Sequence, residues 1–580
     1  MVEHQRIFSL TFLALFLYLI VSTSPSYAEE GPTNGKPVLP GEDCQTNSLK
    51  SWKPQEKWVW EQVCAGKIAN FNLSKSYGGI LDPKELEGWS EKRILSPAFL
   101  ETILLHEPYR GALTRNGVRI VGALFKKPLD LSKATLTHQL LVHASRFESE
   151  VNLSYLHALR LLSLDGSKFT GKLNMNSIEV KESLFMRGGA EFGEVSLIGA
   201  KIRGNLEMIG SKFAGKLNMN SIEVKEGLYM RGGDEFGEVD LIGAKIGGNL
   251  DMDGSRFAGK LNMDSIEVRG YLSMRKKAEF SEVYLGYAKI EGNLGMTGSR
   301  FTGKLNMDSM HVDSSLFMHR GAEFTQPLVL TFAKIGKRID ISGSTLASID
   351  LAGTHIYGEF VLSPPAPQWK EGAKLTLRNA EVGALQDLPW ASTLELDGFN
   401  YACLGGLSTD DSSRVGALKI SRFKEWLEKQ TRYSPQPYEQ LATVLRKAAY
   451  NDKAKAILYE GKKREHWEAT NMLSLSWWWL AFQWLFIGYG YRNFRVLIWC
   501  VIFCGLGMLA LHRSGLDIKN SLKYWGFAYS VDMLLPIIEL HRPHYKIILT
   551  GGVRVYFYIH KIFGYVLGFF LIAGLSGLTK

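Results

Sequence analysis

Two carboxylates near the C-terminus are the residues of this sequence that could do chemistry inside a membrane. Asp532 and Glu539 flank Pro536 in the otherwise apolar stretch 524–540. Ionisable side chains are rare at membrane depth, and where they occur they mark ion or substrate pathways. An apolar segment broken by proline between two spans also has the outline of a pore loop. A channel is therefore one function to consider, although the potassium-channel filter Thr-Val-Gly-Tyr-Gly is absent from 520–545.

The other reactive residues form no recognisable catalytic motif. Cys500 and Cys504 lie in an apolar stretch, at the wrong spacing for thiol redox chemistry. His541-Arg-Pro-His544 is more typical of a proline-bounded turn than of a metal site. The sequence has no Walker A, His-Glu-x-x-His or Gly-x-Ser-x-Gly motif. We therefore predict no cofactor and favour a protein without enzymatic activity.

The apolar segments around these residues predict a membrane domain over 473–580. The segments 496–511 and 555–578 are long or apolar enough to span a bilayer, the first only just. The stretch 473–491 carries four tryptophans, which is the aromatic content of a membrane interface. It either spans the bilayer or lies flat on it, so two to three spans are predicted.

The middle of the chain is one sequence repeat. Gly-Lys-Leu-Asn-Met begins at Gly171, Gly215, Gly259 and Gly303, a period of 44 residues. Within this period an apolar-x-apolar pair recurs every 11 residues, and a small-x-apolar unit lies between successive pairs. Two such units, with two short strands each, predict a four-sided coil of about 22 residues. Coils stacked at ~4.8 Å give a β-helix over 113–400, with roughly eleven coils between 118 and 362.

Glycine accounts for 58 residues, and many of them recur at fixed places in the repeat. We expect corners, with backbone angles that would strain other residues, at Gly204, Gly215, Gly248, Gly259 and Gly292. The outward residues at the centres of the stacked pairs run from Asn174 to Asn306 on one face and from Phe185 to Phe317 on another. They contain no basic stripe, so we do not expect nucleic acid as a partner.

The 11-residue units resemble those of pentapeptide-repeat proteins, with every second unit lengthened by one residue. The resemblance implies a four-sided, right-handed β-helix. A leucine-rich repeat has a similar period, but its Leu-x-x-Leu-x-Leu frame and asparagine ladder are missing. The predicted fold is therefore mainly β: this β-helix, then a small α-helical region and C-terminal transmembrane helices.

The N-terminal residues predict export and a cap. Residues 1–28 have a basic head, an apolar stretch and small residues before a cleavage site, as in a signal peptide. An uncleaved anchor helix is the alternative, for which the apolar stretch is short. The tryptophan-rich region 29–112 is expected to cover the exposed edge of the β-helix. Cys44 and Cys64 would form a disulfide in an exported segment, with two free thiols as the alternative.

Positive charge is concentrated in the C-terminal part of the chain. The net charge is +10, and residues 414–580 contain 23 Lys and Arg against 10 Asp and Glu. The region 412–470 has helical spacing on both sides of a Ser-Pro-Gln-Pro segment, which predicts a basic helical hairpin. Lys462, Lys463 and Arg464 precede the membrane domain and are candidate contacts for anionic lipid headgroups, with a solvated helix face as the alternative.

The complete layout resembles a family of bacterial membrane-associated repeat proteins. The resemblance is carried by Glu56-Lys-Trp-Val-Trp60, Pro435-Gln-Pro-Tyr-Glu-Gln-Leu441 and Gly488-Tyr-Gly-Tyr-Arg492. Some members are labelled membrane-associated oxidoreductases, but no residue here matches a redox role. With the signal peptide, the resemblance implies a bacterial cell membrane location, with the β-helix on the exported, periplasmic or extracellular side.

Three functions follow from these observations. We favour a membrane-anchored, exported β-helix that presents a scaffold surface to a partner protein or a cell-wall polymer. The first alternative is a pore-loop-like channel or transport component, with the β-helix as an accessory domain. The second is a membrane-associated oxidoreductase, by family label only.

Overall fold

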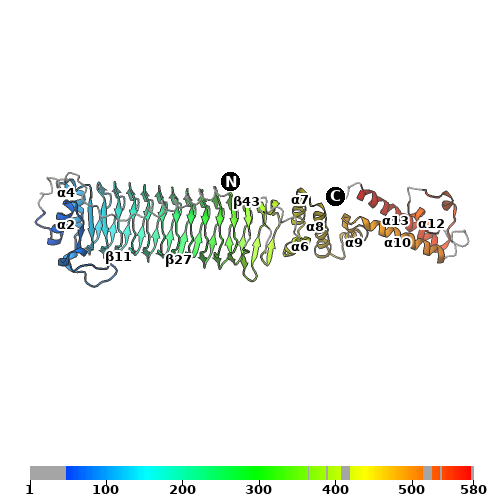
Figure 1. The fold of residues 1–580 in the computed structure, drawn as a ribbon, viewed down its shortest axis with the longest axis horizontal. Coiled ribbons are helices and arrows are strands. Elements are labelled where there is room, and N and C mark those ends of the chain that lie inside the picture. The colour runs from blue at the N-terminus through cyan, green and yellow to red at the C-terminus, as the bar shows by residue number, and fades with distance from the viewer. Residues whose placement is uncertain are drawn as a thin grey trace, which may run out of the picture.

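Three parts lie in sequence order along one long axis: a β-solenoid, a small group of helices and two long C-terminal helices (Figure 1). The computed structural model describes residues 48–362, 365–386, 390–405, 419–513, 526–535 and 539–575. The signal peptide predicted at 1–28 lies outside these residues. Helix makes up 29% and strand 25% of the chain, so "mainly β" describes the solenoid but not the whole protein.

The solenoid consists of short parallel strands that occur four times in each coil. Its first strands are β2 (Val118–Val121), β3 (Leu124–Phe125), β4 (Leu129–Asp130) and β5 (Thr135–Leu136). Equivalent residues of neighbouring coils pair about 22 positions apart, for example Leu162 with Leu184 and Leu173 with Val195. The strands form four columns within two sheets of 25 and 23 strands. The predicted four-sided coil of 22 residues is therefore confirmed.

The solenoid has about 13 turns and extends beyond the region of clear sequence repeats. Its last strands are β44 (Gln368–Trp369), β45 (Lys374–Thr376), β46 (Glu381–Leu385), β47 (Thr393–Glu395) and β48 (Asn400–Leu404). Leu375 pairs with Ile349 and then with Leu394, so these coils keep their pairing although the repeat has weakened. The roughly eleven coils predicted between 118 and 362, together with these weaker coils inside the predicted range 113–400, agree with about 13 turns.

Apolar ladders fill the solenoid. The most regular ladder is a stack of ten phenylalanines, with ring centroids 4.3 to 5.2 Å apart. These residues are Phe125, Phe147, Phe169, Phe192, Phe213, Phe236, Phe257, Phe280, Phe301 and Phe324. Each coil buries its face against the next, so neighbouring coils stabilise one another.

The reason for the glycines at the predicted corners differs from the expected one. Gly204, Gly215, Gly248, Gly259 and Gly292 have no positive φ, so the expectation of unusual backbone angles is wrong there. A Cβ at any of them would instead lie 2.5 to 2.9 Å from a backbone atom of the preceding coil. These glycines are required because two coils approach closely. The left-handed turns lie at other positions.

The N-terminal cap covers the first sheet edge. It comprises α2 (Pro54–Cys64), α3 (Pro97–Leu105), α4 (Tyr109–Ala112) and β1 (Ala69–Asn70), with β1 pairing onto β2. Arg93 is completely buried and donates hydrogen bonds to the carbonyls of Tyr77 and Gly122, 2.9 and 3.1 Å away. The cap thereby satisfies backbone groups that an open sheet edge would leave exposed.

Three helices follow the solenoid: α6 (Ile420–Glu428), α7 (Gln436–Lys447) and α8 (Asn451–Arg464). We call them the collar. The sequence predicts a hairpin here, but the second helical stretch is divided in two. The division falls at Ala449, whose φ of 65° is incompatible with a continuous helix. A π-helix, η5 (Glu465–Ala469), ends the collar.

The C-terminal part begins with α9 (Leu475–Ile487) and η6 (Gly488–Gly490) and continues with α10 (Phe494–Arg513), α12 (Gly526–Leu534), η7 (Arg542–Lys546) and α13 (Gly551–Leu575). α10 and α13 are long and apolar enough to cross a membrane. α9 has 13 residues. At 1.5 Å per residue it is about 20 Å long, which is too short to span a bilayer core of about 30 Å. Two candidate spans are therefore present in the described residues.

Candidate functional site

Asp532 lies on α12 and is completely buried. α12 packs at the end of α10 and α13 that lies far from the collar (Figure 1). The Asp532 carboxylate accepts hydrogen bonds from the backbone N–H groups of Leu540 and His541, at 2.9 and 3.2 Å. Its Oδ2 atom also lies 3.0 Å from Nδ1 of His544. Because its oxygens are satisfied by the chain that returns after α12, Asp532 holds this loop in place.

Glu539, predicted together with Asp532, lies elsewhere. Its side chain is 63% exposed and forms an ion pair with Arg542 at 3.8 Å. The two carboxylates therefore do not converge on one site, because the chain turns between them. This arrangement gives the pore-loop alternative no pair of free intramembrane carboxylates.

A second buried polar group joins α10, α12 and α13. His560 of α13 is completely buried, and its Nε2 atom lies 3.0 Å from the carbonyl oxygen of Ser530. Since a carbonyl only accepts hydrogen bonds, Nε2 must carry a proton. Nδ1 lies 3.2 Å from the hydroxyl of Tyr556. The Ser530 hydroxyl faces Gly507 so closely that a Cβ there would lie 2.0 Å from it.

This second group was not predicted from the sequence, although a signal was present. His560 interrupts an apolar segment, and a histidine at such a depth marks a functional or structural contact. Its partners, by contrast, are a backbone carbonyl and a tyrosine on the same helix, which no motif reveals. Within the described ranges, no three His, Cys, Asp or Glu residues are grouped so that they could hold a metal ion. The polar groups fasten the helices to one another.

The described cysteines lie in the cap, in the last strand of the solenoid and in α10. Cys64 is buried at the end of α2 and is disulfide-bonded. Cys44, its predicted partner, lies outside the described residues, so the pairing stays a prediction. Cys403, Cys500 and Cys504 are free thiols.

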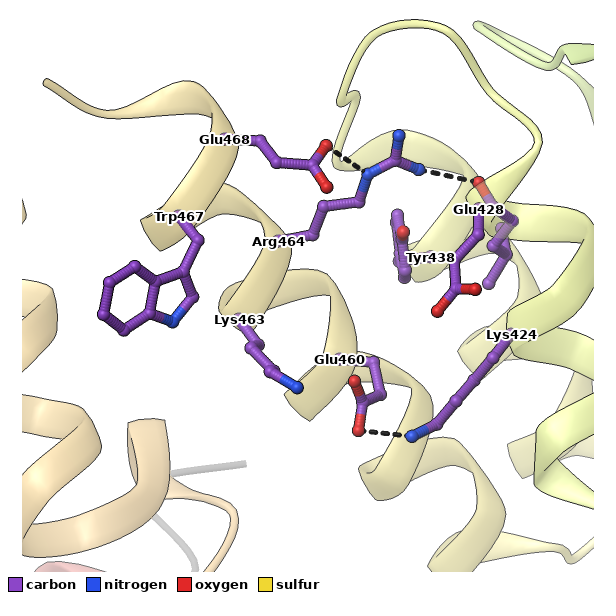
Figure 2. A pocket seen from close by; sticks show the side chains of 9 residues that line it. Lys424, Glu428, Tyr438, Glu460, Lys463, Arg464, Trp467 and Glu468 are labelled. Atoms are coloured by element: carbon purple, nitrogen blue, oxygen red, sulfur yellow. Dashed lines mark hydrogen bonds and ion pairs between the residues drawn. The ribbon is translucent and has the colours of Figure 1, made fainter.

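The collar contains a cavity of about 270 Å³ between α6, α7 and α8 (Figure 2). Charged residues line it in pairs. Lys424 pairs with Glu460, and Nε of Arg464 lies 2.5 Å from Glu468. The other residues of the lining are Leu427, Glu428, Tyr438, Lys463 and Trp467. Because most of its charges neutralise one another, the cavity carries no strong preference for a charged ligand.

The three predicted headgroup residues have different environments. Arg464 has a side chain that is only 11% exposed, and it donates to the carbonyls of Leu427 and Gln430 at 2.8 and 2.7 Å. It thus caps the C-terminal end of α6, where helix carbonyls lack partners. Lys462 pairs with Glu465 at 2.7 Å, and Lys463 is exposed at the edge of the cavity. Arg464 is therefore a structural residue of the collar.

A buried histidine connects the collar to the C-terminal helices. His466 of η5 is 1% exposed, and its Nδ1 atom lies 2.8 Å from the hydroxyl of Tyr489 in η6. Burial lowers the pKa of His466, so the ring is neutral at pH 7. The Arg492 guanidinium lies 4.2 Å from the ring centroid of Tyr459, which joins α8 to the chain after η6. These contacts fix α9 against the collar.

No family model, curated protein or solved structure matches this chain.

Proposed function

We propose that this protein is a membrane-anchored scaffold, which presents its β-solenoid outside the bilayer in a fixed orientation. One observation carries the proposal. A single hydrophobic core extends from Trp52 in the cap, through the solenoid, to Leu458 in the collar. The collar is joined in turn to α9 through the packing of Tyr459, Leu480 and Tyr489. An anchor at the C-terminus would therefore orient the whole solenoid.

The anchor consists of α10 and α13, which pack antiparallel. Val496 near the start of α10 packs with Leu567, and Leu511 near its end packs with Phe557. Only 22% of the apolar window of each helix is buried, which leaves the remaining surface for lipid. In such a pair, the loop between the helices lies on the opposite side of the membrane from the collar.

Charge supports an exported solenoid. Arg513 ends α10, and the segment between α10 and α13 contains Lys519, Lys523, Arg542 and Lys546. Short loops rich in Lys and Arg stay in the cytoplasm. With this loop in the cytoplasm, the solenoid is on the exported side, in agreement with the predicted signal peptide.

Thiol labelling of the full chain tests this topology. Ser265→Cys places a thiol on an exposed turn of the solenoid, and Lys546→Cys places one in the loop between the apolar helices. Both changes are made in a background in which Cys403, Cys500 and Cys504 are serine. A membrane-impermeant maleimide applied to intact spheroplasts should label Ser265→Cys alone, and both variants after detergent is added. Labelling of Lys546→Cys alone would contradict the proposal, and recovery of the chain in the soluble fraction would refute the anchor.

A further inference from the structure

Charged residues on the outside of the solenoid form rows, because equivalent residues of successive coils lie side by side. In three rows the sign of the charge alternates from coil to coil. The first contains Lys168, Glu191, Lys212, Glu235, Arg256, Glu279, Arg300 and Glu323; the second Lys172, Glu194, Lys216, Glu238, Lys260, Glu282 and Lys304; the third Glu179, Lys201, Glu223, Lys245, Glu267 and Lys289. Opposite charges on adjacent strands stabilise a sheet.

The first two rows form ion pairs between coils. Lys212 lies 2.9 Å from Glu235, and Lys216 lies 2.7 Å from Glu238. In the third row, the charged residues from Lys201 to Glu267 form no ion pair with any residue that the structure describes. The charges of this face therefore remain available to a ligand.

A fourth row, on the same face as the third, does not alternate. Two positions after the strand residues of the third row come Lys181, Arg203, Lys225, Gly247 and Arg269, and Glu291 ends the basic run in the next coil. Like charges opposite one another destabilise a sheet. Arg203, Lys225 and Arg269 are exposed and make no ion pair or side-chain hydrogen bond with any residue that the structure describes. Lys181 pairs with Glu179 at 3.4 Å, whereas the charges of these three cations remain available to a ligand.

Arg203, Lys225, Gly247 and Arg269 of this row line a groove of about 650 Å³. The groove crosses the outer faces of β17 (Lys201–Ile202), β21 (Glu223–Val224), β25 (Lys245–Ile246) and β28 (Glu267–Val268). Five cations and two carboxylates line it. Gly247 leaves the gap in the row, and a Cβ there would lie 2.2 Å from the carbonyl oxygen of Lys225. The gap is therefore a fixed part of the fold, and the groove is open to solvent.

We propose that this groove binds a linear anionic glycan that runs along the solenoid axis. Its cations recur at each coil, about 4.8 Å apart, and face a row of carboxylate or sulfate groups along such a chain. Glu223 and Glu267 lie between them and accept hydrogen bonds from sugar hydroxyls. The same carboxylates would repel a polymer that places phosphates beside them where a glycan has hydroxyls. A glycan therefore fits better than polyphosphate or nucleic acid. The identity of the partner rests on the proposed exported scaffold, whereas the groove does not.

The test measures binding of a heparin dodecasaccharide to the purified full chain in detergent, at about 0.15 M salt. One variant combines Arg203→Gln, Lys225→Gln and Arg269→Gln. The control variant combines Lys172→Gln, Lys216→Gln and Arg300→Gln, and removes the same charge from the alternating rows. We expect the groove variant to bind at least tenfold more weakly and the control to change less than twofold. Near-ultraviolet circular dichroism verifies that both are folded; if the triple variant is not, Lys225→Ala with Arg269→Ala replaces it, with at least a threefold loss expected.

Several results would overturn the glycan proposal. Equal losses in the groove variant and the control would show that net charge alone attracts the probe. Polyphosphate or single-stranded DNA that binds as tightly as the dodecasaccharide would refute selectivity for a glycan, as would undetectable binding of heparin to the unmodified chain. The thiol-labelling result is independent of all three, so a failed groove and a failed anchor are distinguishable.

Discussion

At the scale of single residues, Asp234 is a buried carboxyl group in the interior of the solenoid. It occupies a buried position where neighbouring coils have the small residues Ala190, Ser211 and Ala278. Asp234 is 0% exposed; one carboxylate oxygen accepts from the N–H of Ser211, and the other has no partner among the described residues. Burial raises the pKa of Asp234 to about 8. The carboxyl group is therefore protonated in the folded protein near neutral pH.

This raised pKa predicts that the solenoid loses stability as pH rises. In the unfolded chain Asp234 ionises near pH 4, whereas in the folded chain it ionises near pH 8. The folded state binds the proton more tightly, so the free energy of unfolding falls between pH 4 and 8. Asp234→Ala should remove this fall and stabilise the solenoid at pH 7 by up to about 4 kcal/mol. Thermal unfolding at pH 5 and pH 8 measures the effect.

The neighbouring exposed carboxylate Glu235 provides the control for this measurement. It pairs with Lys212 at the surface. Glu235→Ala should leave the pH dependence of unfolding unchanged and alter stability by no more than about 1 kcal/mol. If Asp234→Ala retained the pH dependence of the unmodified protein, the assignment of the titrating group would be wrong.

Arg464 and Lys463 are adjacent in sequence but differ in what they contact. Arg464→Ala would leave the carbonyls of Leu427 and Gln430 without their donors, and hydrogen bonds to a charged group contribute roughly 1.5–3 kcal/mol each. We expect a loss of about 3 kcal/mol in collar stability. Lys463→Ala should change it by less than about 0.5 kcal/mol. Thermal unfolding of both variants tests this, and equal effects would favour the headgroup role predicted from the sequence.

At the scale of elements, the loop after α12 depends on one carboxylate. Asp532→Asn keeps the size of the side chain but weakens its hydrogen bonds to Leu540, His541 and His544. We expect the amides of 540–546 to exchange hydrogen at least tenfold faster in this variant. Glu539→Gln, whose side chain is exposed, should leave the exchange unchanged. Similar exchange in both variants would show that Asp532 does not hold the loop.

An element could be predicted when the residues that determine it lie close together in the sequence, and not when they belong to different coils. The strands and the two apolar helices were predictable because buried side chains recur at short spacings. The corner glycines were misinterpreted because the close contact at Gly292 is with a different coil. The break at Ala449 has no glycine or proline signal. The basic row appears only when residues 22 apart are aligned two positions beyond the strand residues, which is a different column from the outward residues at the centres of the apolar pairs.

At the scale of the whole molecule, the alternating rows explain why the sequence repeats every 44 residues while the coil has 22. A coil with lysine must be followed by one with glutamate, so the smallest unit that repeats is two coils. Deletion of 217–260 removes two coils and leaves Lys212 beside Glu279. Deletion of 217–238 removes one coil and leaves Lys212 beside Arg256.

These two deletions predict opposite outcomes for stability. The 44-residue deletion should fold with a melting temperature near that of the parent and shorten the molecule by about 10 Å, as small-angle scattering measures. The 22-residue deletion should melt at a lower temperature, because three rows then place like charges together, at about 0.2–1 kcal/mol per contact. Raising the salt concentration should reduce the difference between the two. A larger destabilisation by the longer deletion would contradict this account of the 44-residue period.

Because a single core joins the cap, the solenoid and the collar, the distance between the cap and the collar is fixed. With about 13 turns at ~4.8 Å each, the N-terminal cap stands roughly 60 Å beyond the collar, at a height that the number of coils sets. Because charge alternation favours growth by pairs of coils, the favoured increments of this height are about 10 Å.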